Sequence, residues 1–305
     1  MFPVSGFSLL SVVQRYDGTN MIFDTLVDAR TLGDHLGQPD WVVVDCRFRL
    51  DDVTAGALAY AAGHIPGARY ADLERDLSGP RSQGSGRHPL PDVGCLHETL
   101  AAWGINPRTQ VISYDDASGV YAARLWWLLR LIGHRTVAVL DGGLAAWKAL
   151  PGEMTQLMPT VARSVYESST PAVVTVDTSW IEQQLAQVGQ RWVLIDARGA
   201  SRFEGREEPL DGVAGHIPGA VNLPFNGNLG VEGRFLAPGH LRDRFLSILP
   251  PGLPPNAVVH MCGSGVSACH NVLAMERANL CGSRLYAGSW SAWISDPGRA
   301  VARGT

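Results

Sequence analysis

The chain has 305 residues, of which 46% are hydrophobic and 18% charged, with a formal net charge of −4 at pH 7. This length and composition fit two ordinary globular domains and exclude a disordered chain. The small negative charge gives no basic surface for nucleic acid or an anionic membrane, and no apolar run approaches the roughly 20 residues that a membrane-spanning helix needs.

The five cysteines are odd in number and show neither a CxxC pair nor any other metal-ligand spacing. This pattern favours reduced thiols in a cytoplasmic protein and predicts no metal site. We also expect no cofactor. Residues 1–20 have an apolar patch without a basic start or a small-residue cleavage site, so we expect an extension ahead of the fold rather than a signal peptide.

A domain-like pattern begins at Met21. Buried strands, helices and polar loops then alternate, and the segments GHIPGARYADL and SQGSGRHPLPD lie between the first strand and the second helix. The expected elements are a helix from an Asp28 N-cap to Leu36, a strand WVVVD ending at Asp45, a helix near 96–103, a strand over 111–114, a helix ending at Gly133 and a strand VAVL. A stretch with Pro, Thr and Ser, 151–175, is expected to be a linker.

The second half of the chain repeats the first at a spacing of about 150 residues. WVLIDAR echoes WVVVDCR, GHIPGAVNLPF echoes GHIPGARYADL, and CGSGVSACH aligns without a gap on DASGVYAAR. A repeat of this length implies two similar domains, 21–150 and 176–303. The alternation of short strands and helices predicts two tandem α/β domains, each with a mainly parallel sheet flanked by helices.

The most informative stretch runs from Ala257 to Leu280. It predicts a buried strand, a tight loop CGSGVS that begins at Cys262, and a helix with Gly282 as its stop. Glycines let the loop N–H groups turn inward, and the helix dipole adds positive potential, so both favour the thiolate form of Cys262. A cysteine that is only a small buried hydrophobe needs no such loop.

CGSGVSA resembles the active-site loop of the rhodanese superfamily, in the version Cys-Gly-Ser/Thr-Gly-Val-Thr of the 3-mercaptopyruvate sulfurtransferase type, with Ser267 replacing Thr. Members that use thiosulfate typically carry Cys-Arg-Lys-Gly-Val-Thr there. The resemblance extends over about 21–303 through both GHIPGA segments and the terminal GSWSAW. It implies a catalytic second domain and a non-catalytic first domain, in which Asp116 aligns with the cysteine.

The resemblance implies that a small anionic sulfur donor, 3-mercaptopyruvate or alternatively thiosulfate, gives a sulfur atom to Cys262. The resulting persulfide would pass it to cyanide, a thiol or thioredoxin. The donor would bind to the loop residues Gly263, Ser264, Gly265, Val266 and Ser267.

Arg202 matches the family arginine that contacts the substrate anion. Members of the mercaptopyruvate type usually have a second arginine a few residues later. Here Leu210 stands about where it is expected, and Arg206 does not match the position.

Two further residues are candidates. Some family schemes place a first-domain histidine in a relay with the loop serine, so His64 is a possible partner of Ser264, with a structural role in the GHIPGA turn as the alternative. Phe48 could wall the substrate cleft or belong to the core. Arg198 is expected to pair with acids of its own loop, and Cys269 and four tryptophans are expected in the core: Trp126, Trp127, Trp290 and Trp293.

Two other functional classes also use this fold. Cysteine phosphatases and arsenate reductases need a longer loop that is closed by an arginine, whereas Ala268 stands six residues after Cys262. That class is therefore rejected. A non-catalytic binding module is the other alternative, and the intact Cys262 argues against it.

Overall fold

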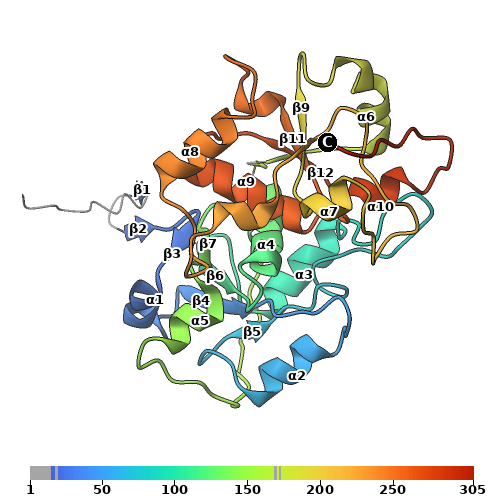
Figure 1. Ribbon diagram of the computed structural model, residues 1–305. Coiled ribbons are helices and arrows are strands. Elements are labelled where there is room, and N and C mark those ends of the chain that lie inside the picture. Colours follow the sequence, from blue (N-terminus) through green and yellow to red (C-terminus); the bar gives the residue numbers. More distant parts are fainter. Residues whose placement is uncertain (1–14, 18–19, 168–169, 172) are drawn as a thin grey trace, which may run out of the picture.

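The computed structural model describes residues 15–17, 20–167, 170–171 and 173–305. The chain forms two α/β halves stacked on one another, with the first half (blue to green) below the second (yellow to red) in Figure 1. The expected extension, 1–20, lies almost wholly outside the described residues. Its described part contributes to a two-stranded antiparallel pair, β1 (Arg15–Asp17) with β2 (Asn20–Ile22).

The first half contains five further strands and five helices among its described residues. The strands are β3 (Leu26–Val27), β4 (Trp41–Asp45), β5 (Arg69–Tyr70), β6 (Gln110–Tyr114) and β7 (Val137–Leu140). The helices are α1 (Ala29–His35), α2 (Ala55–Ala62), α3 (Val93–Ala102), α4 (Val120–Leu131) and α5 (Gly143–Lys148).

The second half repeats this arrangement. Its strands are β8 (Val174–Val176), β9 (Val193–Asp196), β10 (Val221–Asn222), β11 (Val258–Met261) and β12 (Arg284–Tyr286). Its α-helices are α6 (Thr178–Gln184), α7 (Ala200–Phe203), α8 (Pro238–Leu246), α9 (Ser267–Arg277) and α10 (Ser289–Trp293). Three short 3-10 helices complete it: η1 (Leu185–Gln187), η2 (Phe225–Asn228) and η3 (Pro255–Ala257).

Each half has one five-stranded sheet in which every pairing is parallel. The strand orders are β3-β7-β6-β4-β5 and β8-β12-β11-β9-β10, so the two sheets share one topology. This confirms the fold class expected from the repeat. Because parallel strands all end at the same edge, the loops after β4, β6, β9 and β11 gather there and can form a site.

Burial on both faces explains why the strands are continuous apolar runs. In β4, Val42 and Val44 point into the core between the two halves, whereas Val43 points into a second core beneath α1 and α5. The expected Asp28 N-cap is present, since its carboxylate accepts the Thr31 N–H at 2.8 Å. The four tryptophans expected in the core are all buried.

The two halves meet through α4 and α9, which pack directly against each other at the centre of the molecule (Figure 1). One apolar core runs across this contact and includes residues of both helices, such as Leu125 and Leu128 of α4 and Val272 and Leu273 of α9. The helix α9 therefore holds the cysteine loop against the first half.

The segment between α5 and β8 has neither helix nor strand in its described part. It is not loose, because Thr155 pairs with His64 and the Ser164 N–H donates to the Ala101 carbonyl at 2.9 Å. Since β8 begins at Val174, the second sheet starts inside the stretch predicted as linker.

One expected helix end differs from the structure. Helix α9 ends at Arg277, and Asn279 adopts a left-handed conformation with φ 56° just beyond it, so Asn279 terminates the helix in place of Gly282. Among the described residues, no helix is both long and apolar enough to cross a membrane.

Candidate active site

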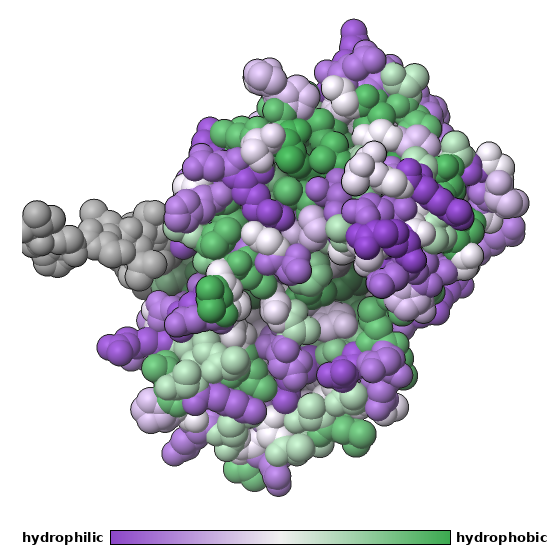
Figure 2. Space-filling view, in the orientation of Figure 1, coloured by the Kyte–Doolittle hydropathy of each residue, from purple (hydrophilic) through white to green (hydrophobic). Residues whose placement is uncertain are grey.

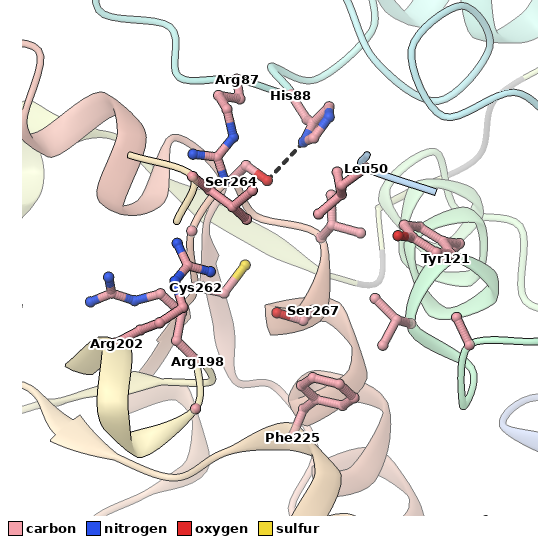
Figure 3. Close-up of a pocket in the computed structure, with 16 residues that line it drawn as sticks. Leu50, Arg87, His88, Tyr121, Arg198, Arg202, Phe225, Cys262, Ser264 and Ser267 are labelled. Atoms are coloured by element: carbon pink, nitrogen blue, oxygen red, sulfur yellow. Dashed lines mark hydrogen bonds between the residues drawn. The ribbon is translucent and has the colours of Figure 1, made fainter. Parts of the chain in front are cut away.

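A cavity of about 300 Å³ opens where the two halves meet. The molecular surface is hollowed along this junction (Figure 2), and Figure 3 shows the side chains that surround the cavity. Both halves contribute to its lining: Leu50, Arg87, His88, Ala117, Val120 and Tyr121 from the first, and Arg198, Gly199, Arg202, Leu210, Phe225, Cys262, Gly263, Ser264, Val266 and Ser267 from the second. The predicted cysteine thus lies in a pocket between the domains.

The strand β11 and the helix α9 position Cys262. It is the first residue after β11, and its side chain is nearly buried, with a residue exposure of 2%. Its backbone is fixed from both sides, because its N–H donates to Ser289 Oγ at 3.1 Å and its carbonyl accepts from the Trp290 N–H at 3.0 Å. The loop leaves the sulfur at the floor of the cavity (Figure 3).

The loop between Cys262 and α9 is a cradle of amide groups. Gly265 has φ 76°, and a Cβ there would collide with the Ala287 carbonyl oxygen, so this position requires glycine. From Gly263 to Ser267, none of the five backbone N–H groups donates a hydrogen bond to another described residue. Free N–H groups at the start of a helix of 11 residues provide a site for an anion.

The corresponding loop of the first half is closed on itself. The Asp115 carboxylate accepts hydrogen bonds from four backbone N–H groups at 2.8–2.9 Å, those of Ala117, Gly119, Tyr121 and Ala122. The loop therefore holds an anion that is part of its own chain, and no cysteine lies there.

Strand register corrects the residue assigned to this position. Asp45 pairs with Tyr114 in the first sheet, and Asp196 pairs with Met261 in the second. The next residues are Asp115 and Cys262, so the counterpart of Cys262 is Asp115 rather than Asp116. The gap-free alignment of CGSGVSACH on DASGVYAAR is therefore displaced by one residue at the end of the strand. Sequence similarity alone does not show which residues of the two strands occupy equivalent positions in the sheets.

A histidine and a glutamate from the first half reach the cysteine loop. His88 Nδ1 lies 2.7 Å from Ser264 Oγ (Figure 3), and His88 Nε2 lies 3.2 Å from Glu74 Oε1. Burial lowers the pKa of His88 to about 4, against the opposing effect of Glu74. The imidazole is therefore neutral at pH 7: Nε2–H donates to Glu74, and Nδ1 accepts from the Ser264 hydroxyl.

The histidine proposed from the sequence as the partner of Ser264 was the wrong one. His64 is fully buried, with Nδ1 2.9 Å from the Tyr60 carbonyl and Nε2 3.2 Å from the Leu157 carbonyl. The two nitrogens thus face backbone carbonyl groups, one in the first half and one in the linker. His64 keeps the alternative role, that of holding the GHIPGA turn, as His216 does against the Phe203 carbonyl at 2.8 Å.

Two arginines from the segment after β9 line the cavity (Figure 3), and acids of the same region pair with them. Arg202 Nε and Nη2 donate to Glu208, and Nη2 also donates to Asp211 at 3.0 Å. Arg198 is paired with Asp196 at 2.6 Å and with Glu208 at 3.3 Å, as expected of an arginine bound by acids of its own loop. Both guanidinium groups line the cavity, so Arg198 also belongs to the site.

The candidate substrate residues divide into those inside and those outside the cavity. Gly263, Ser264, Val266 and Ser267 line it together with Arg202, while Gly265 shapes the loop without lining it. Phe48 is a core residue, because it is 2% exposed and packs edge-on against Tyr121 at 5.5 Å between ring centroids. The lining residues on that side are Leu50 and Tyr121 instead.

Sequence reasoning missed Arg87, His88 and Glu74. The signal was present in the loop SQGSGRHPLPD, where an Arg-His pair stands among glycines and serines, but nothing local indicates that this loop crosses to the other half. Arg206, considered as a substitute for the absent second arginine, is exposed and paired with Glu204 at 2.5 Å.

The second cysteine of the region does not face the cavity. Cys269 is fully buried, and its Sγ lies 3.2 Å from the Gly265 carbonyl oxygen. Burial raises the pKa of its thiol to about 12, despite the nearby Arg124. Within the described part of the chain, no group of three or more His, Cys, Asp or Glu side chains could hold a metal ion.

Comparison with known proteins agrees with this geometry. The family model for the rhodanese-like domain matches twice, over residues 28–150 and 177–296. A Pseudomonas aeruginosa protein named "Probable 3-mercaptopyruvate sulfurtransferase" is 49% identical over 281 residues, which are 92% of this chain and 98% of that protein. A Mycobacterium tuberculosis protein named "Putative thiosulfate sulfurtransferase SseB" is 40% identical to this chain. The match covers 86% of this chain and 91% of that protein.

Solved structures give the same result. This chain superposes on the crystal structure of SseA from Escherichia coli with a TM-score of 0.72 and 30% sequence identity. The superposition covers 87% of this chain and 98% of SseA, and that structure is named among the 3-mercaptopyruvate sulfotransferases. The two ranges matched by the family model include both halves and, in the second half, the cysteine loop. The chain therefore belongs to the rhodanese family and is a sulfurtransferase with two rhodanese-like domains.

Proposed function

We propose that this enzyme takes a sulfur atom from 3-mercaptopyruvate onto Cys262 and passes the persulfide sulfur to cyanide, a small thiol or thioredoxin. The observation that carries the proposal is the cysteine loop itself. Cys262 lies on the floor of a cavity, next to five backbone N–H groups that no other described group uses. Those groups can stabilise the thiolate, and afterwards the terminal sulfur of a persulfide anion.

The first half-reaction moves one sulfur atom and one proton. The Cys262 thiolate attacks the thiol sulfur of the donor, an S–S bond forms, and the bond between that sulfur and the CH2 carbon breaks. Its electron pair stays on the organic fragment as the enolate of pyruvate. The proton of the donor's thiol ends on this fragment, so pyruvate leaves and Cys262 carries a persulfide anion.

Ser264 and His88 are placed to move that proton. The Ser264 oxygen can accept the proton from the donor sulfur while its own proton passes to His88 Nδ1, 2.7 Å away. Glu74 stabilises the imidazolium that forms for a moment, because its carboxylate lies at 3.2 Å from Nε2. The reverse transfer delivers the proton to the enolate.

The second half-reaction restores the enzyme. A nucleophile such as cyanide attacks the outer sulfur of the persulfide, the S–S bond breaks, and its electron pair returns to Cys262 as the thiolate. With cyanide the product is thiocyanate. The cavity must empty pyruvate before the acceptor enters, so we expect ping-pong kinetics.

The charges around Cys262 favour a donor with one negative charge. The guanidinium groups of Arg87, Arg198 and Arg202 are paired with three carboxylates, those of Asp196, Glu208 and Asp211. The pocket is thus nearly balanced, and Gly263 and Ser264 add no cation. A compact dianion such as thiosulfate brings two charges to this site, whereas 3-mercaptopyruvate brings one carboxylate and a carbonyl.

Thiosulfate is the alternative donor, and three lining arginines are the observation in its favour. Steady-state kinetics with both donors, side by side with cyanide as acceptor, test the choice. We expect kcat/KM to be at least tenfold higher for 3-mercaptopyruvate, roughly 1.4 kcal/mol of transition-state binding. A preference for thiosulfate would refute the donor while leaving sulfur transfer in place.

The absence of disulfides supports a cytoplasmic location for this chemistry. Within the described part of the chain no disulfide bond joins any of the cysteines, although Cys95 and Cys281 lie on the surface. A persulfide enzyme needs its thiol reduced between turnovers, and a reducing compartment also supplies thiol acceptors such as thioredoxin.

A further inference from the structure

Arg87 reaches across from the first half and places its guanidinium group beside the catalytic loop. A Cβ atom built on Gly263 would lie 2.9 Å from Arg87 Nη2, and 3.4 and 3.6 Å from Nη2 and Nη1 of Arg202. Gly263 directly follows Cys262. Two guanidinium groups from different domains therefore face the same small volume next to the sulfur, and Figure 3 shows Arg87 and Arg202 both beside Cys262.

Both guanidinium groups keep a nitrogen free for a ligand. Arg87 donates to Asp211 through Nη1, and its backbone N–H donates to Ser291 Oγ at 3.0 Å. Arg202 uses Nε and Nη2 on Glu208 and Asp211. Neither Nη2 of Arg87 nor Nη1 of Arg202 donates to another group within the described part of the chain.

Asp211 orients the guanidinium groups of Arg87 and Arg202. Its Oδ1 accepts from Arg87 and its Oδ2 accepts from Arg202, while its own backbone N–H donates to Glu208 at 3.2 Å. The Asp211 side chain is only 4% exposed, so this acid is held inside the wall and leaves the solvent side of both arginines to the cavity. Two planar cations fixed by one buried acid form a preorganised receptor for a second carboxylate.

We propose, resting on the function proposed above, that Arg87 is the second anion contact of this enzyme, and that it binds the donor carboxylate together with Arg202 over Gly263. It takes the place of the arginine that the sequence lacks near Leu210. The non-catalytic domain thereby determines donor specificity, because the donor is held between an arginine of each domain. The competing interpretation is that Arg87 only ties the halves together through Asp211.

A pair of alkylating agents separates these two interpretations without requiring turnover. 3-Bromopyruvate and bromoacetone share the reactive CH2–CO group, and with each of them the Cys262 sulfur displaces bromide. Only the first carries a carboxylate in the position that the donor's carboxylate occupies. The ratio of their rates at Cys262 measures attraction for the carboxylate alone. Mass spectrometry of the Cys262 peptide excludes reaction at the exposed Cys95 and Cys281.

We expect this ratio to fall at least tenfold in Arg87→Ala, about 1.4 kcal/mol, and comparably in Arg202→Ala. Arg87→Lys should fall between Arg87→Ala and the wild type, since it keeps the charge and loses the fork of donors. The matched control is Arg206→Ala, an exposed arginine of the same segment that pairs with Glu204 and does not line the cavity, which should stay within twofold of the wild type. With 3-mercaptopyruvate, Arg87→Ala should raise KM and leave kcat within about threefold.

Two results would overturn the proposal. One is an unchanged rate ratio in Arg87→Ala where Arg202→Ala lowers it. The other is an equal loss of both alkylation rates, which would mean that Arg87 only positions the halves. If the wild type failed to use 3-mercaptopyruvate, the proposed donor would be wrong, but the ratio would still decide whether Arg87 binds a carboxylate.

Discussion

The loops that follow β6 and β11 have the same length and the same place in their domains. They differ in whether their backbone N–H groups have hydrogen-bond acceptors within the protein. In the first domain, both oxygens of Asp115 accept N–H groups of the loop and of the first turn of α4, at 2.8–2.9 Å. In the second domain, the equivalent residue is Cys262, and the amides from Gly263 to Ser267 have no acceptor among the described residues.

The difference shows how one fold supports both a domain with a closed loop and a domain with an open loop that carries a thiol. A loop that carries its own carboxylate has already satisfied its donors and can bind no further anion there. A loop that carries a thiol instead keeps its donors for the sulfur and for the substrate. The domain with the closed loop also contributes side chains to the site around the open loop, since His88, Glu74 and Arg87 all come from the first half.

Removing the thiol should have the largest effect on this comparison. Cys262→Ser keeps the size of the side chain and should keep the fold, but a hydroxyl cannot accept a sulfur atom at neutral pH. We expect pyruvate release from 3-mercaptopyruvate to fall by a factor on the order of 10⁴ or more, measured with lactate dehydrogenase coupling. Retained turnover, or an extra sulfur found on Cys269, would disprove the role of Cys262.

Removing the Asp115 carboxylate from the first loop should lower the free energy of unfolding and not only the activity. Asp115→Ala leaves four N–H groups without their acceptor, so we expect the free energy of unfolding to drop by about 3 kcal/mol or more. The control is Asp116→Ala, because Asp116 is exposed and should change stability by no more than about 0.5 kcal/mol. Urea unfolding of both variants tests the assignment; equal losses would show that Asp115 is not the internal anion.

The proton relay can be tested with the two donors. Ser264→Ala removes the hydroxyl 2.7 Å from His88 and should lower kcat with 3-mercaptopyruvate by about 10²-fold. With thiosulfate the loss should be small, because sulfite leaves without receiving a proton. Parallel losses with both donors would mean that Ser264 shapes the loop and does not transfer a proton.

The fold was predictable from the sequence because its signals are local or repeated. The apolar run WVVVD gave β4, Asp28 gave the start of α1, and the duplicated segments gave two parallel sheets. The proposed nucleophile was predictable for the same reason, since Cys262, its glycines and the following helix are contiguous. The helix end was misplaced because Asn279 takes a left-handed conformation that glycine usually takes.

The rest of the site was not predictable, because it depends on contacts between distant segments. His88 meets Ser264 across 176 positions, and Arg87 meets Asp211 across 124. His64 stands in a conspicuous motif and Phe48 follows a strand, but both side chains are buried and neither lines the cavity. A motif marks residues that the fold needs as readily as residues that react.

The smallest expected effect concerns pH and the histidines that join the two loops. His88 contacts the second loop, and His270 Nε2 lies 3.1 Å from the Ser118 carbonyl of the first. Burial lowers their pKa to about 4 and about 3. The unfolded chain therefore binds more protons between pH 6.5 and 4, so the contribution of each neutral histidine is present above pH 6.5 and is lost as the pH falls.

We expect each of these histidines to lower the free energy of unfolding by about 1 kcal/mol when the pH falls from 7.5 to 5.5. His88→Gln should lose less stability over this interval than the wild type, by about that amount, in urea unfolding at both pH values. His35→Gln is the control, because that histidine lies at the end of α1, outside both loops. An identical pH slope in the wild type and His88→Gln would show that His88 is not held neutral.

The open loop around Cys262 is tested most directly by a single turnover without acceptor. The enzyme is mixed with 3-mercaptopyruvate, pyruvate is followed in time, and the Cys262 peptide is weighed. We predict a burst of one pyruvate per enzyme and one added sulfur on Cys262, removed again by cyanide as thiocyanate. Pyruvate release without a burst and without added sulfur on Cys262 would contradict the account.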